Sequence, residues 1–173
     1  MVVIVSLAAS RSAGVTAAVM VFPTDGPFAY KVDYLGLTCG HMALESRLEE
    51  FEGRPADHVI MTASNTRFFN KIYRVDGQID SWVDAETMST IAYTSDLTER
   101  GRRKIRRFRV DSETGEAVSE RRGKLKKITF DVSSALDPLA YVYRGRALAG
   151  TTGSTFMLNL LTDDGVIETG SEV

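Results

Sequence analysis

The sequence predicts a mainly β fold, an antiparallel curved sheet that forms a barrel or half-barrel, with one short helix. From Phe28 onward apolar and polar residues alternate with a period of two, the period of a half-buried strand. Clusters of Gly, Pro and Asp separate the alternating segments, as short turns do. The chain has 173 residues, of which 43% are hydrophobic, and shows no repeat or low-complexity linker. These observations predict one domain with a sizeable core.

The first two strands follow from strict alternation. Phe28, Tyr30, Val32 and Tyr34 alternate with polar or small residues, and residues 42–48 repeat the pattern. The sequence Glu-Gly-Arg-Pro at 52–55 then supplies a turn, so we expect the second and third strands to pair antiparallel.

The remaining strands are expected at short, regular intervals. Asp76-Gly77 is expected to form a hairpin turn, the segment from Asp111 to Glu116 a second turn, and Asp164-Gly165 a third. The strands expected around these turns cover residues 59–63, 68–75, 78–83, 90–97, 105–110, 118–122, 125–130 and 156–161. About nine strands fit a sandwich, a closed barrel or a curved half-barrel, and the sequence does not choose between these.

One helix is expected at residues 138–144. Asp137 is a suitable N-cap, Pro138 suits the first helical position and Gly145 suits the C-terminal end. Leu139, Val142 and Tyr143 would share one face, which could close the open side of a curved sheet. A further strand is the alternative for this segment.

The N-terminal 22 residues carry one charge, Arg11, and begin with an apolar run. Small residues at 15–18 suit a signal peptidase, so we expect a signal peptide at residues 1–18, a β-rich domain at 24–173 and a periplasmic or otherwise exported protein. The alternatives are a buried strand of the domain and a transmembrane helix, for which the run is short.

Composition excludes several classes of function. A formal net charge of −2 gives no global attraction to nucleic acid, so we expect no nucleic-acid partner. One cysteine and two histidines leave no zinc-ligand spacing, so no metal and no cofactor are expected. No recognisable catalytic motif is present, and we expect no enzyme and no catalytic residues.

Carboxylates gather around the single tryptophan, Trp82. Asp76, Asp80, Asp84 and Glu86 could resemble an acid–base pair. Alternation places Asp80, Trp82 and Asp84 on one face, and Asp76 and Asp84 suit turn and strand-end positions. We therefore expect these groups to have structural roles.

Aromatic residues are numerous enough to line an apolar cavity. Such a lining is one hypothesis, and packing in a filled core is the alternative. The residues expected to line the cavity are Tyr30, Tyr34, Tyr73, Trp82 and Tyr93.

The strongest compositional deviation is a basic hairpin. Residues 100–109 hold seven cations, and five more follow at 121–127. Arg102, Lys104 and Arg106 would project from one face of an edge or protruding hairpin. Binding of an anionic ligand or head group is the hypothesis, and edge protection against aggregation is the alternative. The residues expected to bind it are Arg102, Arg103, Lys104, Arg106, Arg107, Arg109, Arg121 and Arg122.

Four stretches together resemble the bacterial family called domain of unknown function 3108. They are residues 28–37, residues 72–76 with 81–87, residues 108–111 and residues 137–143. The resemblance implies an exported β-rich protein, similar in outline to periplasmic carriers that hold acyl chains in a half-barrel, and it carries over no catalytic residue.

The function expected from sequence is therefore a non-enzymatic envelope protein that binds an amphipathic or anionic envelope component such as lipid. The alternative is a structural or interaction protein with a filled core that recognises another envelope protein. Neither hypothesis requires a transmembrane span.

Overall fold

The computed structural model describes residues 4–6, 27–111, 113–130, 135–148 and 155–172. Strands β2 to β9 follow one another in one antiparallel sheet, and the three-residue β1 pairs with β2 outside them. The strands are β1 (Ile4–Ser6), β2 (Phe28–Tyr34), β3 (Leu37–Phe51), β4 (Arg54–Asn65), β5 (Val75–Asp84), β6 (Thr90–Glu99), β7 (Arg102–Asp111), β8 (Glu116–Arg121), β9 (Lys124–Thr129), β10 (Thr155–Leu161) and β11 (Val166–Glu172), and the helices are η1 (Phe69–Lys71) and α1 (Pro138–Leu148).

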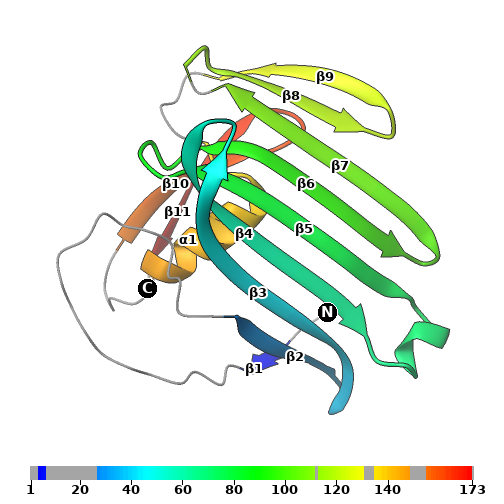
Figure 1. The fold of residues 1–173 in the computed structure, drawn as a ribbon. Helices are drawn as coiled ribbons and strands as arrows, with labels where there is room; N and C mark the ends of the chain where they lie inside the picture. The colour runs from blue at the N-terminus through cyan, green and yellow to red at the C-terminus, as the bar shows by residue number, and fades with distance from the viewer. Residues whose placement is uncertain (1–3, 7–26, 112, 131–134, 149–154, 173) are drawn as a thin grey trace.

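The main sheet is a meander, because each strand pairs with the next one along the chain (Figure 1). Within the part of the chain that the structure describes, the last strand, β9, pairs only with β8 and not with the first strands, so the sheet is open rather than closed into a barrel. The mainly β, antiparallel, curved fold predicted from the sequence is confirmed.

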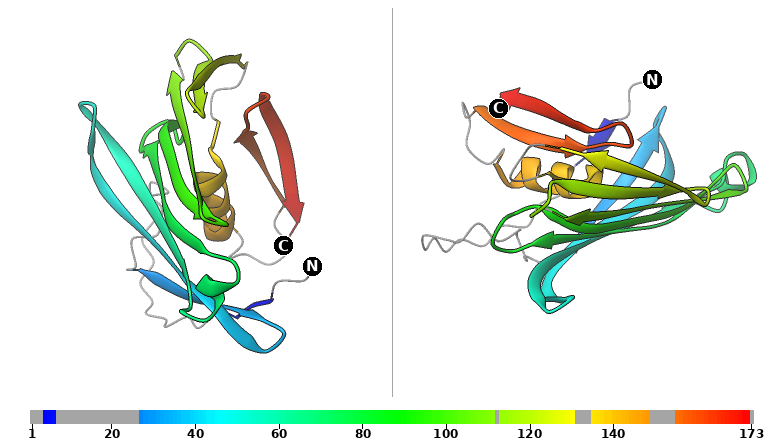
Figure 2. Two further views of the ribbon diagram at one scale, coloured as in Figure 1. Left: turned by 90° about the vertical axis from the view of Figure 1, so that its right-hand side faces the viewer. Right: turned by 90° about the horizontal axis from the view of Figure 1, so that it is seen from above.

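Helix α1 and the β10–β11 hairpin lie together on one side of the curved sheet, which we call the inner face (Figure 2). Helix α1 packs against β10, β5 and β4. Thr90 on β6 donates its amide to the Ala135 carbonyl, and Leu136 bridges to Leu160 on β10. The segment before α1 therefore ties the hairpin to the sheet.

The core lies between the inner face and these covering elements. Inner-face side chains such as Val59, Val83 and Phe108 are at most 1% exposed. Leu139 and Tyr143 of α1 and Leu158 and Leu161 of β10 belong to the same hydrophobic cluster. The predicted helix, α1, thus covers the open side of the sheet together with the β10–β11 hairpin.

Two sequence predictions about the β4–β5 connection are wrong. Residues 68–74 form the short helix η1 and a loop rather than a strand, β5 begins only at Val75, and Asp76-Gly77 lies inside β5 rather than in a turn. Gly77 pairs with Leu97 at a φ of 154°, and a Cβ there would come within 2.2 Å of the Asp96 carbonyl oxygen. The glycine is therefore required by close strand approach and not by a reversal of the chain.

The helix and the basic strand also differ from expectation. Helix α1 continues through Gly145 to Leu148, and Val142 is 61% exposed instead of sharing the buried face. Strand β7 is internal, with β6 and β8 on either side, rather than an edge. Several of its cations, among them Arg103, Arg106 and Arg107, form ion pairs with neighbouring strands or with the β10–β11 turn. The predicted cleavage region at 15–18 lies outside the described residues.

Candidate functional site

Every second turn of a meander falls at the same end of the sheet. The β2–β3 turn at Leu35 and Gly36, the β4–β5 connection at residues 66–74, the β6–β7 turn at Arg100 and Gly101 and the β8–β9 turn at Arg122 and Gly123 all lie at one end (Figure 1). We call these turns and the strand residues next to them the basic end.

The basic end carries cations that are exposed to solvent. Among the described residues, no carboxylate forms an ion pair with six of them. These are Arg67, Lys71, Arg100, Arg102, Arg122 and Lys124. Because their charge is not neutralised locally, they give this end a positive potential at short range.

A hollow of about 840 Å³ opens at the basic end. The guanidinium of Arg100 lies 4.9 Å from the centre of the Tyr73 ring, and the Tyr73 hydroxyl donates to Glu99 at 2.8 Å. Hydrogen bonds from Lys104 and Tyr73 lower the pKa of Glu99 below its usual value, so this carboxylate stays ionised. The hollow is lined by Tyr73, Glu99, Arg100, Arg102, Arg103, Lys104 and Arg122.

Four of the eight predicted head-group cations therefore meet at one place, namely Arg102, Arg103, Lys104 and Arg122. Arg103 also pairs with Asp96, and Lys104 pairs with Glu99. These ion pairs are exposed and contribute little to stability. A bound anion could therefore compete for both cations at small cost.

The other four predicted cations serve ion pairs elsewhere on the sheet. Arg106 and Arg121 both bind Asp163 on the β10–β11 turn, Arg107 pairs with Glu120 and Arg109 pairs with Glu52. Partial burial raises the pKa of Asp163, but hydrogen bonds and charge from Arg106, Ser119 and Arg121 outweigh this and bring it below its usual value. Arg106 and Arg121 thus hold the hairpin against the sheet.

The opposite end of the sheet, formed by the β3–β4, β5–β6 and β7–β8 turns, is acidic. Its cations, Arg54, Arg109 and Lys127, each pair with a carboxylate there. The carboxylates are more numerous and comprise Glu50, Glu52, Asp84, Glu86, Asp111, Glu113 and Glu116. The molecule is therefore electrostatically polarised along its strands.

The five aromatic residues predicted to line a cavity are not brought together. Tyr30 and Tyr93 lie in the core, 8% and 4% exposed, whereas Tyr34 is 46% exposed beside the β2–β3 turn. Tyr73 lines the hollow at the basic end, and Trp82 lies on the outer face. The described residues therefore give no common lining from this set.

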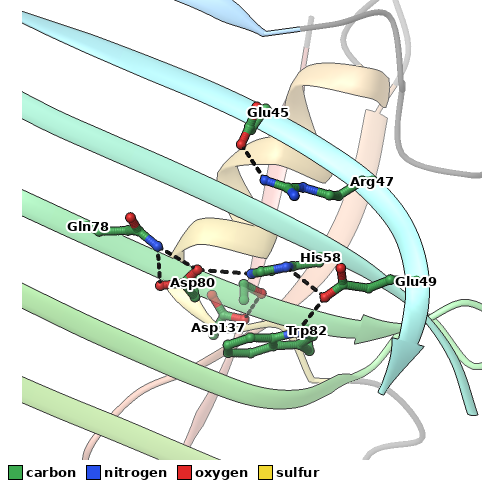
Figure 3. A network of polar contacts seen from close by, with 9 residues as sticks. Glu45, Arg47, Glu49, His58, Gln78, Asp80, Trp82 and Asp137 are labelled. Atoms are coloured by element: carbon green, nitrogen blue, oxygen red, sulfur yellow. Dashed lines mark hydrogen bonds and ion pairs between the residues drawn. The ribbon is translucent and has the colours of Figure 1, made fainter. Parts of the chain in front are cut away.

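On the outer face, Trp82 belongs to a polar and aromatic network (Figure 3). Its ring stacks on His58 and on Phe51, with centroid distances of 4.4 Å and 4.8 Å. The ring nitrogens of His58 lie 2.8 Å from Glu49 Oε1 and 2.9 Å from Asp80 Oδ1. Trp82 Nε1 donates to the same Glu49 oxygen. The network fixes the orientation of Trp82 across three strands.

Three of the four carboxylates near Trp82 have a structural partner, one of them Asp80 through His58. Asp76 pairs with Arg74, and Asp84 accepts the amides of Glu86 and Thr87 at the end of β5. Burial raises the pKa of Asp84, but these backbone hydrogen bonds, the Thr87 side chain and the charge of Arg54 together bring it below its usual value.

Asp137 is fully buried beneath the sheet and caps α1. One carboxylate oxygen accepts the amides of Leu139 and Ala140, and the other accepts the hydroxyls of Ser81 and Thr90. Burial raises the pKa of Asp137 in spite of these hydrogen bonds. The capping role is readable from Asp-Pro in the sequence, whereas the bonds to β5 and β6 depend on the tertiary fold.

The sequence pattern counted Arg100 and Lys124 among the clustered cations but not among the expected head-group ligands, and it gave no role to Arg67 and Lys71. Lys71 lies in the segment 68–75 that was expected to be strand and Arg67 immediately precedes it, so nothing in the linear pattern placed them beside the 100–104 cluster. Only the meander topology, which puts alternate turns together, could have indicated them.

Among the described residues, no helix is long and apolar enough to cross a membrane.

A family model described as "Protein of unknown function (DUF3108)" matches residues 29–171. No curated protein and no solved structure matches the chain.

Proposed function

The chain belongs to the DUF3108 family of proteins of unknown function, and on this basis we propose that it is a non-enzymatic envelope protein that binds an anionic envelope component, such as a lipid, at the basic end. The observation that carries the proposal is the group of six exposed cations at that end with which no carboxylate pairs among the described residues; three of them, Arg100, Arg102 and Arg122, line the hollow. Arginine guanidinium groups bind phosphate and carboxylate oxygens through directed, charge-assisted hydrogen bonds. A phosphate-bearing head group fits this chemistry.

The position of the core supports a surface site. Tyr143 and Leu161 are at most 1% exposed between α1, the hairpin and the inner face, where an apolar chain would have to enter. The anionic head group is therefore bound at the basic end, and the protein does not need to enclose the acyl chains.

The same burial of Tyr143 and Leu161 favours a second candidate, an interaction protein with a filled core that recognises another envelope protein. The basic end would then bind an acidic surface of that protein. The compartment in both candidates is the envelope, which the apolar N-terminal run and the family resemblance support.

Sedimentation with lipid vesicles tests the proposal. Arg102→Glu with Arg122→Glu reverses two unpaired cations at the basic end, and it spares Arg106, whose reversal would break the tie to Asp163. Arg47→Glu with Lys127→Glu is the matched control, because it makes the same charge change at exposed cations away from the basic end.

Wild-type protein should sediment with vesicles that contain phosphatidylglycerol. With vesicles of pure phosphatidylcholine the protein should remain in the supernatant. Each basic residue near an anionic leaflet contributes about 1 kcal/mol, so the double reversal at the basic end should weaken binding at least about tenfold. The control should bind within about threefold of wild type, since exposed charges away from the contact are screened. Equal binding by both double variants would exclude the basic end as the site.

The second candidate replaces the first if the wild-type protein binds none of these vesicles but binds an envelope protein, and if this binding is lost in Arg102→Glu with Arg122→Glu.

A further inference from the structure

The basic end exposes large apolar side chains in addition to its cations. Among the described residues, five of the eleven exposed large apolar side chains belong to it. Their exposed fractions are 46% for Tyr34, 85% for Leu35, 60% for Leu37, 64% for Phe68 and 68% for Ile72. Apolar side chains grouped on a protrusion indicate an interaction surface.

These side chains come from two turns that lie side by side. The Thr66 amide donates to the Cys39 carbonyl, and the Thr66 hydroxyl donates to the Thr38 carbonyl, so the 66–74 connection is tied to the start of β3. Leu35 and Leu37 are therefore neighbours of the segment that presents Phe68 and Ile72. The rings of Phe68 and Phe69 pack edge to face, with their centroids 5.3 Å apart.

Cations flank the apolar side chains directly. Arg67 precedes Phe68 and Lys71 precedes Ile72, and both cations are exposed and unpaired among the described residues. Arg100, Arg102 and Arg122 continue the positive surface along the same end of the sheet. The partner that fits this surface therefore has anionic groups on its surface and an apolar layer beneath them.

A bilayer of anionic lipid has this layered chemistry. We propose that the basic end docks on such a bilayer, with Leu35, Leu37, Phe68 and Ile72 entering the head-group region and the six unpaired cations lying against the phosphates. This inference rests on the proposed function and names the bilayer surface as the partner. The acidic end would point away from the membrane, because like charges repel, and the polarity of the sheet would set the orientation.

The first test removes the apolar side chains without changing charge. Phe68→Ser with Ile72→Ser should weaken binding to phosphatidylglycerol vesicles about tenfold or more at fixed ionic strength, since buried apolar area is lost from the docked state. Leu48→Ser with Val142→Ser is the control, because these side chains are 57% and 61% exposed and lie outside the basic end. The control should bind like wild type.

The outcomes separate this inference from the proposed function. If Phe68→Ser with Ile72→Ser binds like wild type while Arg102→Glu with Arg122→Glu loses binding, insertion is overturned and anion binding stands. If both double variants bind like wild type, both proposals fail.

A second measurement reports insertion itself. Trp82 is the single tryptophan and lies on the outer face between β4 and β6, so it gives a built-in control. Phe68→Trp in a Trp82→Phe background moves the indole to the proposed contact. Vesicles with brominated acyl chains should quench this indole by half or more and should leave wild-type Trp82 fluorescence nearly unchanged. Equal quenching of the two proteins, or none in either while both are bound, would overturn the proposal.

Discussion

The guanidinium of Arg106 on β7 hydrogen-bonds the carboxylate of Asp163 on the β10–β11 turn, across 57 residues of sequence. Arg121 on β8 and the Ser119 hydroxyl bind the same carboxylate. One side chain thus fastens the covering hairpin to two strands of the main sheet, and this attachment uses two of the cations that the sequence offers as ligand-binding candidates.

Asp163→Asn should therefore destabilise the protein, because it removes the charge that Arg106 and Arg121 share. We expect a loss of about 1–2 kcal/mol in the free energy of unfolding, since Asp163 is only 20% exposed. Asp164→Asn is the matched control, because its carboxylate is 94% exposed and, among the described residues, pairs only with Lys126, so it should cost less than about 0.5 kcal/mol. Urea unfolding measures both. Equal losses in the two variants would contradict a specific role for Asp163.

The same attachment predicts part of the acid sensitivity. The pKa of Asp163 is lower in the folded protein than its usual value, so its contribution to stability is present above the unfolded pKa of about 3.9 and is lost as pH falls through the folded pKa. The stability difference between wild type and Asp163→Asn should therefore shrink as pH falls below about 4. Unfolding curves between pH 2 and pH 6 would show this, whereas a difference independent of pH would exclude the ion pair as its cause.

Asp137→Ala should be the more damaging change, because it removes the helix cap and leaves the buried hydroxyls of Ser81 and Thr90 without an acceptor. We expect a loss of about 2–4 kcal/mol. Asp137→Asn keeps an oxygen for the amides of Leu139 and Ala140, so it should cost less than half as much at pH 7. Thermal unfolding followed by circular dichroism compares the two, and equal destabilisation would mean that the cap contributes little.

Vesicle binding should depend on salt in two stages. Screening contracts from about 8 Å at physiological ionic strength to about 3 Å at 1 M, so most of the Coulomb contribution of the basic end should disappear. Apolar insertion is not screened, so weak residual binding should persist at 1 M salt in wild type and should be absent from Phe68→Ser with Ile72→Ser. Binding that is insensitive to salt would contradict an electrostatic contribution from the basic end.

The architecture was predictable where local pattern and tertiary environment agree. The alternation from Phe28 to Tyr34 predicted β2, and Asp137 with Pro138 predicted the start of α1. The β4–β5 connection was not predictable, because Phe68 and Ile72 are apolar yet face solvent, and alternation is a guide only where apolar residues face a core.

The candidate site was predictable only in part. The cluster at 100–104 is visible in the sequence, but its association with Arg67, Lys71 and Arg122 depends on which turns the meander places together. The role of Arg106 depends on Asp163, whose position on the covering hairpin no local pattern specifies.

Deuterium uptake of the wild-type protein, measured with and without phosphatidylglycerol vesicles, tests the central claim most directly. Docking through the basic end predicts slower uptake confined to the β2–β3 turn, residues 66–74 and the β6–β7 and β8–β9 turns, with unchanged uptake at the β3–β4, β5–β6 and β7–β8 turns. Slower uptake at the acidic end, or faster uptake in α1 and the β10–β11 hairpin as the inner face opens to lipid, would contradict it.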